Sequence, residues 1–322
     1  MADRRKMAGN RKKKRRNKIR KTEIIMSIIL AVLLIVAVAV FFQKEKHAKA
    51  TEKSVETAGQ TKAAGRKETE SSKTEGSDAK SSEKQAEEEE QTEKVPDRSN
   101  FAVQPGVSVG TTEQSDEKVV YLTLDDGPSD NTQAVLDILD KYNAKATFFV
   151  TGEMPEYKDM IKVAYDKGHT IGMHTYSHDY AKVYASVDAY FQDLDQIGQM
   201  VKEEIGYVPC FIRFPGGSSN TVSKKYTPGI MSTLVQEVQN RGYQYYDWNG
   251  SSGDGSVRTT EELVAQATSF DSNNIILLCH DSHGKQTTVE ALPQIIEHYQ
   301  SLGYTFKALD RDSFVAHHGV NN

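Results

Sequence analysis

The carboxy-terminal part of the sequence predicts an α/β fold, an incomplete or distorted (β/α)7 barrel. Two observations support this prediction. From Val119 onward, short apolar runs alternate with amphipathic stretches, and repeated strand–helix units imply parallel strands joined by right-handed crossovers. Seven such units in about 190 residues suit a compact, incomplete barrel better than a barrel of eight units.

The predicted elements follow one another regularly along the chain. Strands are predicted at residues 119–124, 146–151, 169–173, 210–214, 243–248, 275–278 and 304–309. Helices, with an apolar stripe at helical spacing, are predicted at residues 132–142, 156–167, 187–205, 230–240, 261–270 and 289–302. Four of these helices are followed by a glycine, which a left-handed helix cap favours, at Gly168, Gly206, Gly242 and Gly303.

The amino-terminal part has the composition of a membrane anchor. Residues 24–42 are apolar and uncharged, and at about 1.5 Å per residue they are just long enough to cross a bilayer of roughly 30 Å. Residues 1–23 are basic and are therefore predicted to be a cytoplasmic tail. We expect a single-pass transmembrane helix in the cell membrane with the remaining chain extracytoplasmic. A cleaved signal peptide is the alternative, since Ala37-Val38-Ala39 resembles a cleavage site.

Residues 43–116 separate this anchor from the folded domain, predicted at residues 117–316. Most of the segment is rich in Lys, Glu, Ser and Thr and poor in branched apolar residues, so we expect a disordered linker, with an ambiguous lead-in from residue 101. The net charge of the chain is −5, and membrane topology accounts for the basic tail, so we expect no nucleic-acid partner. The two cysteines, Cys210 and Cys279, are expected to be free and buried, with a single disulfide as the alternative.

Ionisable side chains gather at the ends of five predicted strands, where α/β barrels build their active sites. They are Asp125, Asp126, His174, His178, Arg213, Asp247 and His280. Two histidines and one carboxylate can hold a divalent cation with an open position, which lowers the pKa of a bound water, and a second carboxylate can act as the base. Zinc is the expected cation, with cobalt, nickel or manganese as alternatives. The sequence therefore predicts a metal-assisted hydrolase.

Five short motifs carry a resemblance to a known family. They are Thr-Leu-Asp-Asp-Gly at residues 123–127, His-Thr-Tyr-Ser-His at 174–178, Arg-Phe-Pro at 213–215, Asp-Trp at 247–248 and Leu-Cys-His at 278–280. With these motifs, over about residues 117–309, the chain resembles the polysaccharide deacetylases of carbohydrate esterase family 4, which share the NodB homology domain. Two positions depart from the family pattern: Leu124 replaces the commoner phenylalanine, and Gly216 stands where many members have tyrosine.

The resemblance implies how the metal and the base are arranged. Asp126, His174 and His178 would bind the metal. Asp125 would accept the proton of the attacking water as general base. Arg213 would pair with Asp125 and keep it ionised and oriented, because a nearby cation favours a carboxylate.

The resemblance also implies how the leaving group and the acetyl group are handled. His280 would protonate the leaving amine as general acid, and Asp247 would hydrogen-bond His280 and raise its pKa. The backbone N–H of Gly216 would help to hold the tetrahedral oxyanion. Trp248 and Leu278 would form the walls of the slot that receives the acetyl methyl group.

These expectations combine into a function. We expect a metal-dependent hydrolase that removes N-acetyl groups from a cell-wall glycan, namely from the N-acetylglucosamine of peptidoglycan, because the predicted anchor and linker place the domain near the wall. One alternative is a deacetylase of another polymer: chitin oligomers, an exopolysaccharide, xylan or N-acetylmuramic acid. Another is a non-catalytic glycan-binding module.

Overall fold

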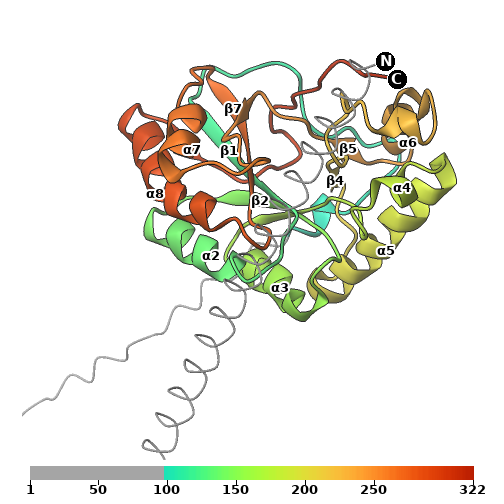
Figure 1. The fold of residues 1–322 in the computed structure, drawn as a ribbon, viewed down its shortest axis with the longest axis horizontal. Coiled ribbons are helices and arrows are strands. Elements are labelled where there is room, and N and C mark those ends of the chain that lie inside the picture. Colours follow the sequence, from blue (N-terminus) through green and yellow to red (C-terminus); the bar gives the residue numbers. More distant parts are fainter. Residues whose placement is uncertain (1–97) are drawn as a thin grey trace, which may run out of the picture. The chain divides into compact units, whose positions relative to one another are not determined.

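The strands form one curled, parallel sheet. The computed structural model describes residues 98–322 (Figure 1). The strands are β1 (Val119–Asp125), β2 (Ala146–Val150), β3 (Thr170–Met173), β4 (Phe211–Ile212), β5 (Gln244–Tyr245), β6 (Gly250–Ser251), β7 (Asn274–His280) and β8 (Thr305–Phe306). They follow the order β5-β4-β3-β2-β1-β7-β6, with β8 paired to β1, and each of these pairings is parallel. This arrangement confirms the predicted α/β fold with an incomplete barrel.

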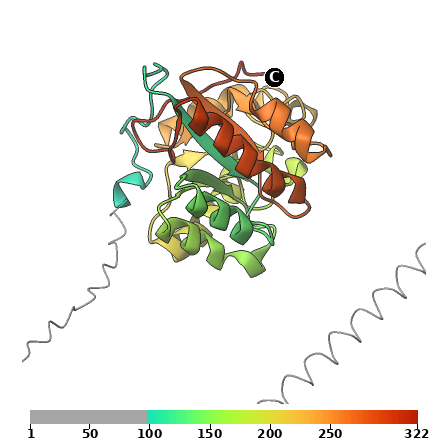
Figure 2. The same cartoon turned by 90° about the vertical axis from the view of Figure 1, so that its left-hand side faces the viewer.

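Helices cover the outer face of this sheet (Figures 1 and 2). They are α2 (Thr132–Lys141), α3 (Asp159–Asp166), α4 (Tyr180–Val183), α5 (Val187–Ile205), α6 (Ile230–Asn240), α7 (Thr260–Ala267) and α8 (Gln286–Ser301), with 3-10 turns at η1 (Ser99–Phe101), η2 (Pro155–Tyr157) and η3 (Ser223–Lys225). The residues of α5 and α6 are those predicted. Helix α5 begins where the Ser186 hydroxyl accepts a hydrogen bond from the Ala189 N–H, and it ends at left-handed Gly206.

Alternating side chains of each strand face two apolar layers. In β1, Leu122 and Leu124 belong to the cluster shared with the helices, whereas Tyr121 belongs to a smaller cluster inside the curl. The ring of Phe149, from β2, also lies inside the curl and packs against Gly172 of β3, where a Cβ atom would be 2.5 Å from the ring. The glycine therefore sets how closely this part of the inner layer packs.

The free edge of β5 is covered by two segments that are distant in sequence. The N–H of Asp247 donates to the carbonyl of Ala316 at 3.0 Å. Thr111 forms a parallel bridge with Phe314, and Val109 is buried in the inner cluster. The lead-in before residue 117 thus packs as part of the domain, which begins earlier than the predicted boundary and continues past residue 316.

The elements absent from the prediction are short. Strand β6 consists of Gly250 and Ser251, which give no alternation of apolar and polar residues. Helix α4 spans a single turn after Asp179, whose carboxylate accepts the N–H of Ala181. Strands β4 and β5 have two residues each, although the Arg213 N–H continues the ladder by donating to the Met173 carbonyl. Such short elements lie below the length at which periodicity is readable.

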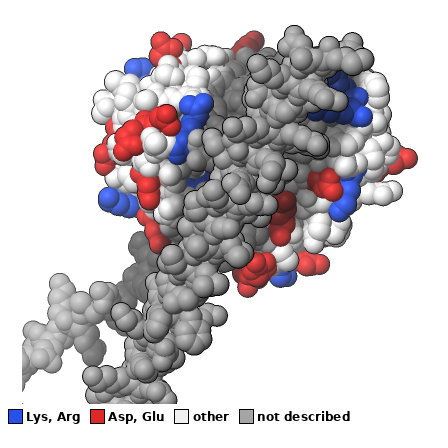
Figure 3. Space-filling view, in the orientation of Figure 1, with Lys and Arg blue, Asp and Glu red and all other residues white. Residues whose placement is uncertain are grey.

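The predicted cytoplasmic tail, the anchor at 24–42 and the linker up to residue 97 lie outside the described residues. Within residues 98–322, no helix combines the length and apolar character needed to traverse a bilayer. On the visible face of this part of the chain, Lys and Arg side chains are interspersed with Asp and Glu (Figure 3). Both cysteines are free and buried, as predicted.

Replacing Gly172 by alanine should destabilise the fold. The added Cβ would meet the Phe149 ring at 2.5 Å and the Phe211 carbonyl oxygen at 3.2 Å, so neighbours must move. Overpacking of this kind costs about 1–3 kcal/mol. Urea unfolding should show a lower midpoint for Gly172→Ala and little change for the control Gly319→Ala, because a Cβ at Gly319 meets nothing within 4 Å. Equal midpoints for the two variants would contradict this packing.

Candidate active site

The ionisable side chains predicted for the site meet at the carboxyl ends of the strands, as the fold requires. Asp125, the last residue of β1, pairs in register with His280, the last residue of β7. Side chains two residues apart on a strand share a face, so Thr123, Asp125, Leu278 and His280 all point into the curl. The neighbours Leu124 and Cys279 belong instead to the layer beneath the helices. Cys279 therefore lies outside the site, and burial raises its pKa.

Asp126, His174 and His178 form a compact cluster at this end, with one ligand atom from each within 4.8 Å of the others. Asp126 Oδ1 lies 3.5 Å from His174 Nε2 and 3.4 Å from His178 Nε2. The same oxygen is buried and has no hydrogen-bond partner among the described residues. A buried carboxylate oxygen without a donor is costly, and a cation between the three groups would satisfy it. The residues thus fit a divalent cation, and this cluster is a candidate metal site.

The ionisation of the cluster also suits a cation. Burial opposes charge on Asp126, but the imidazoles of His174, His178 and His280 outweigh it and lower the pKa of this carboxyl. Burial lowers the pKa of His174, which favours the neutral ring that ligates metals. The Nδ1 of His174 lies 2.8 Å from the Arg213 carbonyl, so a hydrogen bond there leaves the Nε2 lone pair facing Asp126.

The backbone around these ligands is in an unusual conformation. Asp126, Thr175 and His178 have φ values of 70°, 71° and 47°, in the left-handed region that non-glycine residues rarely adopt. Such strain costs about 1–3 kcal/mol per residue and is maintained by surrounding contacts. One such contact comes from Asp193 of α5, whose carboxylate accepts the Tyr176 N–H at 2.5 Å and the Ser177 N–H at 3.1 Å. The loop is thereby fixed to a helix.

Arg213 is fully buried and makes the predicted pair with Asp125, at 2.7 Å from Nη1 to Oδ1. Its guanidinium also donates to the Thr123 hydroxyl and to the carbonyls of Tyr246 and Asp247. The Phe149 ring lies beneath it, 4.4 Å from the guanidinium carbon to the ring centre. Because Arg213 fixes one oxygen of Asp125, the second oxygen is left facing the cluster, 3.7 Å from His174 Nε2.

The prediction that Asp247 hydrogen-bonds His280 is wrong. His280 Nδ1 lies 2.8 Å from the carboxylate of Asp254, which also accepts the His280 N–H and the Thr288 hydroxyl. Burial alone would lower the pKa of His280, but the hydrogen bond and charge of Asp254, together with the adjacent aspartates at the end of β1, raise it to about 9. His280 Nε2 faces Asp126 at 4.0 Å. The raised pKa favours the imidazolium form, and the ring lies at the edge of the candidate metal site.

Asp247 instead organises the loop of the third motif. Its carboxylate accepts the Ser218 N–H at 2.8 Å, the Ser218 hydroxyl at 2.5 Å and the His318 N–H at 2.8 Å. The side chain after β5 turns toward this loop and the carboxy-terminal segment because three hydrogen-bond donors are available there. Asp247 thus supports the wall of the site without touching His280.

The predicted substrate-binding residues lie around the same groups. Gly216 and Gly217 are both left-handed, with φ of 75° and 77°, and the N–H of Gly216 has no hydrogen-bond partner among the described residues. Trp248 is half-buried and packs against Gly217 and the Arg213 guanidinium, at 5.6 Å from its ring centre. Leu278 is almost buried on the inner face of β7. The structure therefore brings all three to the site.

The buried carboxyl of Asp281 requires a glycine at position 127, directly after the aspartate pair. Asp281 lies so close to Gly127 that a Cβ atom at Gly127 would be 2.3 Å from it. One oxygen of Asp281 accepts the Thr132 hydroxyl at 2.6 Å, and burial, with the charges of the aspartate pair, raises its pKa to about 7.

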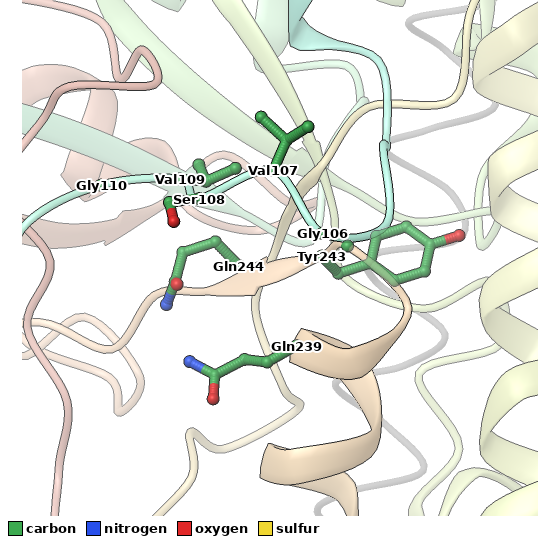
Figure 4. Close-up of a pocket in the computed structure, with 9 residues that line it drawn as sticks. Gly106, Val107, Ser108, Val109, Gly110, Gln239, Tyr243 and Gln244 are labelled. Atoms are coloured by element: carbon green, nitrogen blue, oxygen red, sulfur yellow. The ribbon is translucent and has the colours of Figure 1, made fainter.

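A separate pocket lies at the opposite, amino-terminal end of β5 (Figure 4). Its volume is about 390 Å³, and it is lined by residues 106–110 and by Gln239, Gly242, Tyr243 and Gln244. None of the residues predicted for the site lines it. The pocket is therefore separate from the candidate metal site at the carboxyl ends of the strands.

Comparisons with known proteins agree with this geometry. The family described as polysaccharide deacetylase matches residues 112–230. Over 65% of this chain, a peptidoglycan-N-acetylglucosamine deacetylase of Bacillus cereus is 30% identical with 78% of its length covered, and a putative polysaccharide deacetylase, YheN, of Bacillus subtilis is 30% identical with 72% covered. The crystal structure of the catalytic domain of peptidoglycan N-acetylglucosamine deacetylase from Eubacterium rectale superposes with a TM-score of 0.63 at 46% identity, over 67% of this chain and 98% of that one.

Sequence, fold and arrangement of motif residues thus lead to one assignment. Residues of the five motifs gather at one end of the sheet, and His280 pairs with Asp254 in place of Asp247. The similarity extends over most of the length of the relatives and almost all of the solved catalytic domain. The chain belongs to the polysaccharide deacetylase family and carries its NodB homology domain, that of carbohydrate esterase family 4.

Proposed function

We propose that the protein is a metal-dependent hydrolase that removes acetyl groups from the N-acetylglucosamine of peptidoglycan. The observation that carries the proposal is the buried, unpartnered Asp126 oxygen between two imidazoles, with Asp125 on one side and His280 on the other. Family membership supports the deacetylation, and the relatives named for peptidoglycan support the substrate.

The mechanism assigns each reacting group to a residue of the chain. Asp126, His174 and His178 would hold the cation, which when bound supplies Lewis acidity toward the acetamide carbonyl and makes water more acidic. Asp125 accepts the proton of the attacking water through the oxygen that Arg213 leaves free.

Groups on the opposite side of the site act when the tetrahedral intermediate breaks down. The free N–H of Gly216 is available to donate to the oxyanion. His280, charged through its contact with Asp254, donates its proton to the departing sugar amine. The products are acetate and a glucosamine residue, so the wall gains positive charge.

Loss of the cation or of its carboxylate ligand should abolish acetate release. We expect purified peptidoglycan to yield acetate with the zinc-loaded protein, none after chelation, and recovery when zinc is added back. Asp126→Asn should lower kcat/KM by about a thousandfold, equivalent to several kcal/mol of transition-state stabilisation. The control Asp137→Asn changes an exposed aspartate of α2 and should be neutral. Activity that survives chelation would contradict the proposal.

The alternative substrates are separated by the same assay. Chitin oligomers, an exopolysaccharide, acetylated xylan and a glycan carrying N-acetyl groups only on muramic acid can each replace peptidoglycan, with the product identified by mass spectrometry. We expect the highest kcat/KM on peptidoglycan, at glucosamine. Glycan binding without acetate release would indicate a binding module.

The Asp254 contact should set the alkaline limit of activity. The pKa of His280 is raised to about 9, so its proton is present at neutral pH and lost as pH rises through that value. Asp254→Asn removes the charge that raises this pKa, and the alkaline limb of kcat should move about one pH unit or more toward acid. Asp247→Asn is the control: it should lower stability but leave the limb in place. If the alkaline limb moved only in the Asp247 variant, the result would favour the Asp247–His280 pair predicted from the motif.

We further propose, from residues 24–42 alone, that the full chain is anchored in the cell membrane with this domain outside the cytoplasm. Cell fractionation should recover the full chain with membranes, and deletion of residues 1–42 should release it. External protease on intact protoplasts should remove the domain. A soluble full-length chain would contradict the proposal.

A further inference from the structure

The space beside Gly216 is occupied by another residue's hydroxyl group. A Cβ atom built on Gly216 would lie 2.7 Å from the phenol oxygen of Tyr180 and 3.1 Å from Asn220 Cβ. A side chain at position 216 and the Tyr180 hydroxyl therefore exclude each other. The third motif has no side chain at Gly216, and the hydroxyl of Tyr180, from α4, occupies the space that a side chain there would take.

The Tyr180 ring is held from two sides, so its hydroxyl has a defined position. It packs edge-on against His178, with ring centres 5.7 Å apart, and against Tyr184, with centres 5.6 Å apart. The Tyr184 hydroxyl donates to the Pro215 carbonyl at 2.8 Å, which ties this aromatic pair to the third-motif loop. Tyr180 thus spans from the candidate metal ligand His178 to Gly216.

The Tyr180 hydroxyl differs from that of Tyr184 in what it binds. Among residues 98–322 it has no hydrogen-bond partner, although the side chain is half-buried. The neighbouring N–H of Gly216 is likewise without a partner in this part of the chain. Both donors lie at Gly216, near a candidate metal ligand and without acceptors among residues 98–322, and are therefore available to one oxygen of a ligand.

We propose that Tyr180 is a catalytic residue that contacts the substrate, its phenol O–H donating to the acetamide oxygen as that oxygen becomes the oxyanion, beside the N–H of Gly216. This inference rests on the proposed deacetylase function. The phenol keeps its proton throughout: the water oxygen bonds to the carbonyl carbon, the C–N bond breaks, and the amine receives its proton from His280. Tyr180 contributes a hydrogen bond that strengthens as negative charge develops.

The kinetic test is Tyr180→Phe, which keeps the ring and removes only the hydroxyl. We expect kcat on peptidoglycan to fall about tenfold or more, with KM changed less than about twofold, because the bond forms fully only in the transition state. The control Tyr226→Phe removes the hydroxyl of an exposed tyrosine and should leave both constants unchanged.

An unchanged kcat in Tyr180→Phe would overturn the inference. So would a raised KM at constant kcat, which would mean that the hydroxyl binds the sugar in the ground state instead. If the unaltered protein releases no acetate, the proposed function fails, and that result is distinct from a failure of Tyr180.

A stability measurement tests the geometry without any activity. Gly216→Ala should lower Tm because of its positive φ and because its Cβ meets the Tyr180 hydroxyl. In the Tyr180→Phe background that contact is absent, so the same alanine should cost less, by about 2–4 °C in Tm. Additive changes in Tm would show that the hydroxyl does not lie beside Gly216, and the inference would be withdrawn.

Discussion

The buried guanidinium of Arg213 is the interaction on which the rest of the site depends. It joins the ends of β1, β4 and β5, since it pairs with Asp125 and donates to the carbonyls of Tyr246 and Asp247. A charge with no access to water must be satisfied in full, because an uncompensated buried ion costs about 3–5 kcal/mol. The requirement for folding and the requirement for orienting the proposed general base, Asp125, are therefore met by the same contacts. The carbonyl of Arg213 extends this link to His174.

The sequence predicted the parts of the site that are fixed by strand position. Asp125 and His280 end strands whose apolar runs are easily read, Asp126 follows directly, and parallel strands must bring their carboxyl ends to one edge. The partner of His280 was missed because Asp254 follows a strand of two residues in a Gly- and Ser-rich stretch. Asp247 was predicted to pair with His280 because it belongs to one of the five motifs. The direction of a side chain after a strand, however, depends on the hydrogen-bond donors that surround it. Asp193 lies on helix α5, 17 residues after Tyr176, and no motif pointed to it.

The left-handed residues show how local strain and ligand geometry are related. Asp126, Thr175 and His178 give up favourable backbone conformations, and the cost is offset by contacts such as those of Asp193. As a result, one carboxylate oxygen of Asp126 and the Nε2 atoms of His174 and His178 lie close together, and that oxygen has no hydrogen-bond donor among residues 98–322. Helix α4, which carries Tyr180, begins directly after this loop, so the backbone that places the candidate ligands His174 and His178 also places Tyr180.

The lead-in and the carboxy-terminal segment meet along β5, where Thr111 bridges Phe314 and the Arg311 guanidinium donates to the Ala102 carbonyl. Ala102 and Arg311 are 209 positions apart in the chain, so this edge of the sheet stays open until both segments have been synthesised, and contacts of such sequence separation form slowly. Assembly of the Asp247 support, which needs the backbone N–H of His318, therefore waits for the carboxy-terminal segment.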